Sequence, residues 1–168
     1  MGRICGSVVV ISMLAIPALA QSPQTSAPPT TQRLPYGLSI SLDNAKAVMS
    51  AAEAEAKRNS WNVVITILDS GGHLVLSQRI DGAPIASVGI AEGKARTAVE
   101  FKRPTKDLDD LIAQGGGALR LLALRSATPL EGGLPIIVDE KVIGSIGVSG
   151  ALASQDAQIA RVGAGAAK

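Results

Sequence analysis

The sequence predicts an α+β domain in which helices flank an antiparallel sheet. Helix-like segments alternate with two pairs of strand-like segments, in the order helix, hairpin, helices, hairpin, helix. Within each pair the strands are joined by a short polar or glycine-rich turn, as antiparallel neighbours are. A chain of 168 residues has room for one such domain.

The second hairpin, Gly132 to Gly150, is the part around which we expect the domain to be built. Its second strand has one face with almost no bulk, which carries Ile143, Ser145, Gly147 and Ser149. Glycine weakens a strand unless another group approaches the backbone closely. The sequence therefore predicts a close neighbour on that face, either a helix or a ligand.

Residues 1–20 read as a signal peptide. Arg3 precedes an apolar run from Ile4 to Ile16, and Ala18-Leu19-Ala20 fits the small-x-small rule for cleavage. The run is shorter than the roughly 20 apolar residues of a spanning helix, which disfavours an uncleaved anchor. We expect cleavage after Ala20 and a periplasmic or secreted protein with no membrane association after cleavage.

Residues 21–40 form the expected linker, a disordered segment rich in Pro, Ser and Thr, and the domain is predicted over 41–168. The single cysteine, Cys5, lies in the signal, so the mature protein has no disulfide, thiolate metal site or cysteine nucleophile. The net charge is only +2, and no basic stripe or aromatic stacking platform is visible. Nucleic acid is therefore excluded as a partner.

The first helix is predicted to begin after the N-cap residue Ser41. Its buried face carries small apolar residues, namely Ala45, Val48, Met49, Ala52 and Ala56. Asn62 to Leu68 reads as a strand buried on both faces, because its apolar residues are continuous. His73 to Arg79 alternates in polarity and reads as its partner, nearer the edge of the sheet.

The second half of the chain contains the other helices. Pro84 is placed in the first turn of a helix that Pro104 ends, with a buried face at Val88, Ala91, Ala95 and Ala98. Thr105 is expected to cap a short turn over 106–110. A break at 115–117 precedes a segment over 118–124, and Ser154 is expected to cap a final helix over about 155–167.

Seven short motifs follow one another between Asp69 and Asp156, and the match that they carry covers about Ser41 to the C-terminus. They are Asp69-x-Gly-Gly-His-Leu-Val, Arg79-x-Asp-Gly-Ala, Lys94-Ala-Arg-Thr-Ala, Arg103-Pro-Thr, Glu131-Gly-Gly-Leu-Pro-Ile, Ile143-Gly-x-Ile-Gly-Val-Ser-Gly-Ala and Gln155-Asp. Each motif alone has little specificity. Together, and in this order, they resemble the GlcG/HbpS family, which also occurs as the C-terminal domain of PduO-type proteins.

The resemblance implies a profilin-like or PAS-like antiparallel sheet flanked by helices, and assembly into homo-oligomers through those helices. Some members of the family bind haem, including exported ones, and others accompany glycolate or propanediol metabolism without a demonstrated reaction. Where the family often has methionine in the Arg-Met-Asp-Gly-Ala motif, this chain has Ile80. A thioether at that position therefore cannot ligate a metal here.

His73 is the only histidine of the chain. Its imidazole is a candidate axial ligand to haem iron. The alternative is a histidine at the start of a strand, with its ring half solvated or bonded to a turn carbonyl.

Arg79, Asp81 and Lys94 form a second group of candidate ligand-binding residues. Arg79 and Asp81 lie on the same side of an extended chain, and Lys94 lies mid-helix, where a cation usually needs a partner. Arg79 and Lys94 would hold haem propionates or the carboxylate of a small organic acid. Alternatively, Lys94 and Asp81 form an ion pair that fixes the loop to the helix.

Thr105 is a further candidate for ligand contact, although an N-cap role also explains it. No catalytic residue is predicted. The segment Gly147-Val148-Ser149-Gly150 lacks the Gly-x-Ser-x-Gly elbow, and the carboxylates of Asp107, Asp109 and Asp110 suit a solvated helix start. One histidine and no mature cysteine leave no three-ligand metal site except one made of oxygen ligands.

We therefore expect an exported, non-catalytic protein that binds a small ligand, with haem as the first candidate. One alternative is an enzyme or accessory protein acting on a small hydroxy or keto acid. Another is a structural oligomer without a ligand.

Overall fold

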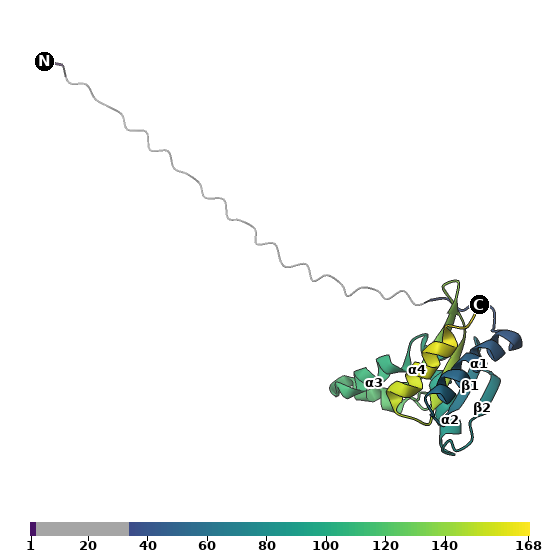
Figure 1. Ribbon diagram of the computed structural model, residues 1–168. Coiled ribbons are helices and arrows are strands. Elements are labelled where there is room, and N and C mark those ends of the chain that lie inside the picture. The colour runs from purple at the N-terminus through teal and green to yellow at the C-terminus, as the bar shows by residue number, and fades with distance from the viewer. Residues whose placement is uncertain (3–33) are drawn as a thin grey trace. The chain divides into compact units, whose positions relative to one another are not determined.

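The computed structural model describes residues 1–2 and 34–168, and residues 34–168 contain all the elements of the fold (Figure 1). In order they are α1 (Leu42–Arg58), β1 (Val64–Asp69), β2 (Leu74–Arg79), α2 (Ser87–Phe101), α3 (Thr105–Ala113), the 3-10 helix η1 (Gly116–Ala123), β3 (Gly133–Val138), β4 (Lys141–Ser149) and α4 (Ala153–Ala164). The predicted α+β class and the order of hairpins and helices are confirmed.

The four strands form one antiparallel sheet in the order β2-β1-β4-β3. β1 is an inner strand and is buried along almost all of its length, whereas the side chains of the edge strand β2 are exposed or half-buried. Strands buried on both faces read as continuous apolar runs, and half-exposed strands alternate. The predicted difference between the two strands of the first hairpin is confirmed.

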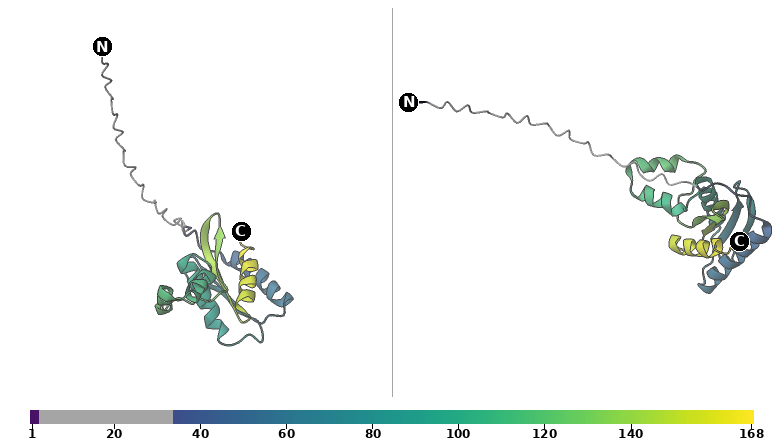
Figure 2. Two further views of the ribbon diagram at one scale, coloured as in Figure 1. Left: turned by 90° about the vertical axis from the view of Figure 1, so that its left-hand side faces the viewer. Right: turned by 90° about the horizontal axis from the view of Figure 1, so that it is seen from above.

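Helices cover both faces of the sheet. α2 packs on β4, β1 and β3, and Figure 2 shows it on the side opposite to α1 and α4. α1 and α4 pack against each other over the main core, which includes Ile65, Ile67, Ile146, Val148 and Ile159. α3 and η1 pack on each other at the side of the sheet (Figure 1).

Gly147 explains the bare face of β4. A Cβ atom added there would collide with the carbonyl oxygen of Ala91, and it would lie 2.5 Å from the backbone nitrogen and 3.0 Å from the Cβ of Ala95. Both alanines belong to α2, whose backbone therefore rests directly on the strand. Of the two neighbours considered for this face, a helix is the one present at Gly147.

Several predicted helix boundaries are wrong. Pro84 lies before α2, because the chain makes a further turn in which Ser87 donates to the carbonyl of Pro84. Ser154 lies inside α4, whose start is set by the side chains of Gln155 and Asp156, which accept from the N–H groups of Leu152 and Ala151.

The buried face of α2 is also smaller than predicted, because Val88 is exposed. The other members of the predicted face, Ala91, Ala95 and Ala98, are fully buried. The N-cap role predicted for Ser41 is confirmed, since its hydroxyl accepts from the N–H of Asn44 at 3.2 Å.

Residues 34–40 belong to the folded body, so the linker predicted over 21–40 extends too far. Tyr36 forms a parallel bridge with Val142, its hydroxyl donates to the carbonyl of Val99 at 2.8 Å, and Ile40 is buried. The signal peptide and the rest of the linker fall on residues 3–33, outside the described residues, apart from residues 1–2. Across the described ranges, no helix combines the length and apolar character needed to cross a membrane.

Candidate functional site

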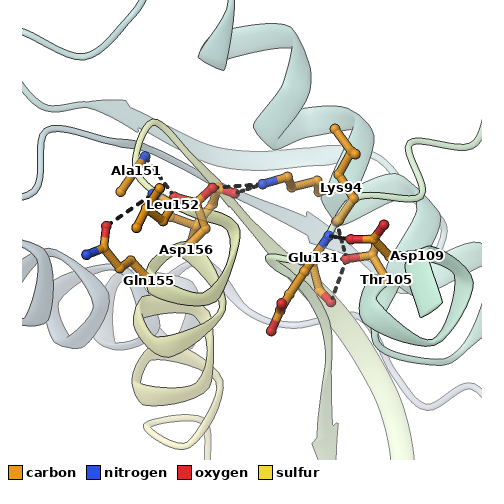
Figure 3. Close-up of polar contacts among 11 residues, drawn as sticks. Lys94, Thr105, Asp109, Glu131, Ala151, Leu152, Gln155 and Asp156 are labelled. Carbon is orange, nitrogen blue, oxygen red and sulfur yellow. Dashed lines mark hydrogen bonds and ion pairs between the residues drawn. The ribbon is translucent and has the colours of Figure 1, made fainter. Parts of the chain in front are cut away.

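A buried ion pair joins α2 to α4. The ammonium of Lys94 lies 2.8 Å from Oδ2 of Asp156, and it also donates to the carbonyl of Val148 at 2.9 Å (Figure 3). The side chains of Lys94 and Asp156 are only 4% and 3% exposed. The predicted pair of Lys94 with Asp81 is wrong, because the partner of Lys94 is Asp156 and Asp81 is exposed in a turn.

Asp156 also organises the loop between β4 and α4. Its Oδ1 accepts from the N–H of Ala151 at 3.1 Å. Burial raises the pKa of the Asp156 carboxyl, while the bonds from Lys94 and from the backbone of the loop act in the opposite direction. One carboxylate thus connects a lysine of α2 to the loop that begins α4.

Thr105 closes the segment that carries α3 and η1. Its hydroxyl donates to the carbonyl of Leu130 at 2.6 Å and accepts from the N–H of Gly133 at 2.9 Å (Figure 3). The start and the end of the segment are thereby tied together. The predicted N-cap role of Thr105 is wrong, because the N-cap residue of α3 is Pro104 and the hydroxyl is used by the chain before β3.

Lys94, Asp156 and Thr105 together form what we call the frame. Two glycines fit the start of β3 into this frame. A Cβ atom at Gly132 would lie 2.8 Å from the carbonyl oxygen of Val148 and 2.9 Å from the ammonium of Lys94, and Gly132 also has a positive φ of 125°. A Cβ atom at Gly133 would collide with the carbonyl oxygen of Lys94 and lie 2.7 Å from Cγ2 of Thr105. Only glycine lets the backbone pass between Lys94 and Thr105.

A cavity of about 230 Å³ lies beside this frame, between α3, the start of β3 and α4. We call it the α3–β3–α4 pocket. Its lining combines apolar surface and both signs of charge: Pro104, Lys106, Asp107, Glu131, Gly132, Gly133, Leu134, Ala157 and Arg161. Lys94 and Thr105 lie behind this lining and are not part of it.

His73 lies elsewhere, at the turn between β1 and β2. Its side chain is 82% exposed, and its Nδ1 lies 3.4 Å from Oδ1 of Asp69. That carboxylate also accepts from the N–H groups of Gly71 and His73. Burial acts to raise the pKa of Asp69, but the N–H donors of His73 and Gly71 and the imidazole outweigh it and hold the pKa below its ordinary value.

A cation of α2, Arg96, bonds the residue that precedes His73. Its guanidinium donates to the carbonyl of Gly72 at 3.1 Å and pairs with Glu92 at 2.9 Å. Sequence reasoning quoted Arg96 within a motif but assigned it no role. The fold brings it to the turn because α2 crosses the sheet above β1.

Arg79 and Asp81 do not join either group. Arg79 ends the edge strand β2, six residues after His73, so it lies roughly 20 Å from it along the strand. β1 and β4 separate Arg79 from the ammonium of Lys94, which makes the distance about 10 Å or more. The five predicted site residues are therefore divided: Lys94 and Thr105 share one frame, and His73, Arg79 and Asp81 lie apart from it.

Residues 34–168 hold no cluster of three or more His, Asp or Glu side chains that could bind a metal ion. Sequence reasoning also missed Arg161 and the role of Asp156. The motif Gln155-Asp pointed to Asp156, whereas nothing in the sequence pattern marked Arg161, which the fold brings to the pocket one helical turn after Ala157.

Comparisons with known proteins agree with this fold. Protein GlcG of Escherichia coli (strain K12) is 42% identical over 111 residues, which cover 66% of this chain and 81% of GlcG. A crystal structure of HbpS matches with a TM-score of 0.71 and 32% identity, over 79% of this chain and 92% of HbpS. The crystal structure of the PduOC:heme complex matches with a TM-score of 0.71 and 28% identity, over 77% of this chain and 95% of PduOC.

The family model described as haem degrading protein HbpS-like matches residues 40–165. This range includes every element from α1 to α4 and both groups of candidate residues. The resemblance inferred from the seven motifs is confirmed, and the chain belongs to the HbpS-like family, in which GlcG and HbpS are its relatives.

Proposed function

We propose that this protein binds haem and is exported, and that it binds haem without turning it over. The likeness to the haem complex of PduOC, over most of both chains, is the observation that carries the proposal. Membership in a family described as haem degrading supports the haem-binding part of the proposal, whereas the absence of turnover rests on the sequence, in which no catalytic residue is predicted.

The turn around His73 suits an axial ligand. A histidine that ligates a metal through one ring nitrogen usually donates its other N–H to a carboxylate, which fixes the ring. Asp69 is placed for this at Nδ1, and Nε2 has no partner among the described residues. The imidazole would supply the axial ligand to the iron.

The surroundings of His73 offer both apolar surface and cations for a porphyrin. Leu74 is exposed beside it, and Leu38 is 91% exposed in the segment whose Ser39 hydroxyl bonds Ser70 of the turn. Arg96 bonds the carbonyl of Gly72, the residue before His73, so it is the cation that we expect to meet a propionate. The propionate role predicted for Arg79 and Lys94 does not suit this surface, because Arg79 lies at the far end of β2 and Lys94 is buried in its ion pair.

The α3–β3–α4 pocket does not suit a whole haem. Its 230 Å³ falls below the roughly 300–1,000 Å³ of pockets that enclose drug-sized ligands. It also has no histidine, cysteine, methionine or tyrosine in its lining. Haem is therefore assigned to the exposed turn and not to this cavity.

A haem titration followed by absorbance tests the proposal. The protein must carry no histidine tag, because His73 is the only imidazole of the chain. We expect a saturable Soret band in the wild type and its loss or shift in His73→Ala. Arg96→Gln removes a charge-assisted hydrogen bond and should weaken binding about tenfold, whereas Arg125→Gln, at an exposed arginine elsewhere in the chain, should leave binding unchanged.

A spectrum unchanged in His73→Ala would remove His73 from the site and contradict the proposed geometry. A Soret band that decays with formation of an open-chain product, in the presence of a reductant, would contradict the non-catalytic part of the proposal. No saturable spectral change in the wild type would contradict haem binding itself.

Export and self-association are parts of the same proposal. The signal sequence predicted over 1–20 supports export, and fractionation of cells that express the full chain should place the processed protein outside the cytoplasm.

Exposed leucines on and beside η1, Leu119, Leu122 and Leu124, support association with a second copy. Light scattering coupled to size exclusion should give a mass above that of one chain, and Leu122→Asp should lower it.

The alternative function, chemistry on a small hydroxy or keto acid, placed its carboxylate between Arg79 and Lys94. That arrangement does not suit the observed geometry, since the Lys94 ammonium is satisfied by Asp156 and Val148. A small acid bound by those two residues is therefore not proposed.

A further inference from the structure

The α3–β3–α4 pocket is walled by charges of both signs that come from three different elements. Lys106 and Asp107 lie in the first turn of α3, Glu131 precedes β3, and Arg161 lies in the last turn of α4. The apolar part of the wall is formed by Pro104, Leu134 and Ala157. Two cations and two carboxylates thus surround a small, partly apolar cavity.

Three of these four charges have no ion-pair partner within residues 34–168. Lys106 pairs with Asp110 at 2.7 Å, outside the pocket lining. Asp107, Glu131 and Arg161 form no salt bridge in that range, although all three line one cavity. A ligand that brings both signs of charge would satisfy them together.

A simple anion does not match this wall. Asp109 and Asp110 lie on α3 outside the pocket lining, and together with Asp107 and Glu131 they outnumber Lys106 and Arg161. Glu131 and Asp109, in addition to Asp110, contribute to raising the pKa of Lys106, which places these carboxylates near one another. The ion pair of Lys94 and Asp156 beneath the pocket is neutral overall and does not change this balance.

We propose that the α3–β3–α4 pocket binds a small zwitterion of the amino-acid class. The guanidinium of Arg161 receives the carboxylate, for which its planar fork is suited. Asp107 and Glu131 receive the ammonium, and the apolar wall of Pro104, Leu134 and Ala157 contacts a short aliphatic side chain.

The size of the cavity restricts the class further. At about 230 Å³ it is smaller than pockets for drug-sized ligands, so a short free amino acid suits it better than a peptide or a nucleotide. The site is independent of the haem proposal, because His73 and Arg96 lie at the β1–β2 turn, whereas β3 forms the opposite edge of the sheet.

Calorimetric titration of the full domain tests the proposal with L-valine, L-alanine and L-serine as ligands. We expect saturable binding of at least one of them. The corresponding carboxylate without the ammonium and the amine without the carboxylate, which for valine are isovalerate and isobutylamine, should each bind at least tenfold more weakly. Arg161→Gln and Glu131→Gln should weaken binding at least tenfold, whereas Arg125→Gln, outside the pocket lining, should not.

His73→Ala should keep the affinity for the amino acid, so failure of this proposal and failure of the haem proposal are distinguishable. Binding of isovalerate as tight as that of valine would show a simple anion site and overturn the inference. Absence of saturable heat with all three amino acids, or unchanged affinity in Arg161→Gln, would overturn it as well. Circular dichroism of each variant checks that a loss of binding is not a loss of folding.

Discussion

Replacing Gly147 by alanine should destabilise the fold although it adds one methyl group to a strand. The new Cβ atom would collide with the Ala91 carbonyl and lie 2.5 Å from the backbone nitrogen of Ala95, and neither backbone atom can rotate away. α2 would have to move off the sheet. Overpacking of this kind costs typically about 1–3 kcal/mol, and we expect the upper part of that range because the obstacle is backbone.

Gly89→Ala is the matched control for this change. Gly89 lies in α2 itself, and a Cβ atom there would meet nothing within 4 Å. Alanine should therefore stabilise the helix by roughly 0.5–1 kcal/mol. In urea, where m is about 1–3 kcal/mol/M, Gly147→Ala should lower the unfolding midpoint by about 1 M and Gly89→Ala should raise it slightly. Equal or greater stability of Gly147→Ala would refute the argument that α2 rests on a bare strand.

Further substitutions test the polar contacts described above. Lys94→Met and Asp156→Asn each break a buried ion pair, and each should lower the free energy of unfolding in urea by about 3–5 kcal/mol. The double variant should lower it by less than the sum of the two single changes. Thr105→Val should lower the free energy of unfolding by about 1–3 kcal/mol, whereas Thr105→Ser should retain most of the stability. Equal losses in the valine and serine variants would show that the hydroxyl is unimportant. Ser145→Ala should be neutral or stabilising by up to about 1 kcal/mol, because the Ser145 hydroxyl is buried and has no partner within residues 34–168. The pKa of Asp69 is lowered in the fold, so its stabilisation of the turn is present above the ordinary carboxyl pKa and is lost as the pH falls through the lowered pKa. The protection factors of the Gly71 and His73 amides, which compare their exchange with the intrinsic rate at the same pH, should fall over that range, and Asp69→Asn should abolish this pH dependence.

Local pattern was sufficient for the strands and for most of the helices, although the turn expected over 106–110 is part of the longer helix α3. Continuous apolar residues marked β1 as an inner strand, and the bare face of β4 indicated a close neighbour, which the structure shows to be α2. Helix starts were predicted less well. At α4 the start depends on the side chains of Gln155 and Asp156, and no rule based on an N-cap residue alone anticipates that they reach back to the loop.

The candidate site was predicted only in part, because its contacts join residues far apart in the sequence. Lys94 was identified as a cation in need of a partner, but the partners considered were a ligand and Asp81, and not Asp156, which lies 62 residues away. The same limit applies to Thr105, whose acceptor Leu130 and donor Gly133 lie across the whole α3–η1 segment. Composition indicates that a group needs a partner, whereas topology decides which partner it meets.

The motifs that place this chain in its family account mainly for the frame and not for the choice of ligand. Lys94, Gly132 and Asp156 all occur in motifs, and their contacts hold α2, β3 and α4 together. Asp107 and Arg161 lie outside every motif, yet they supply charge to the pocket wall. A frame whose central ion pair is neutral leaves the charge of the pocket to such lining residues. For the zwitterion proposed here, substitutions at positions 107 and 161 should change the affinity of the pocket without changing the fold, which makes these positions the ones to compare between this protein and its relatives.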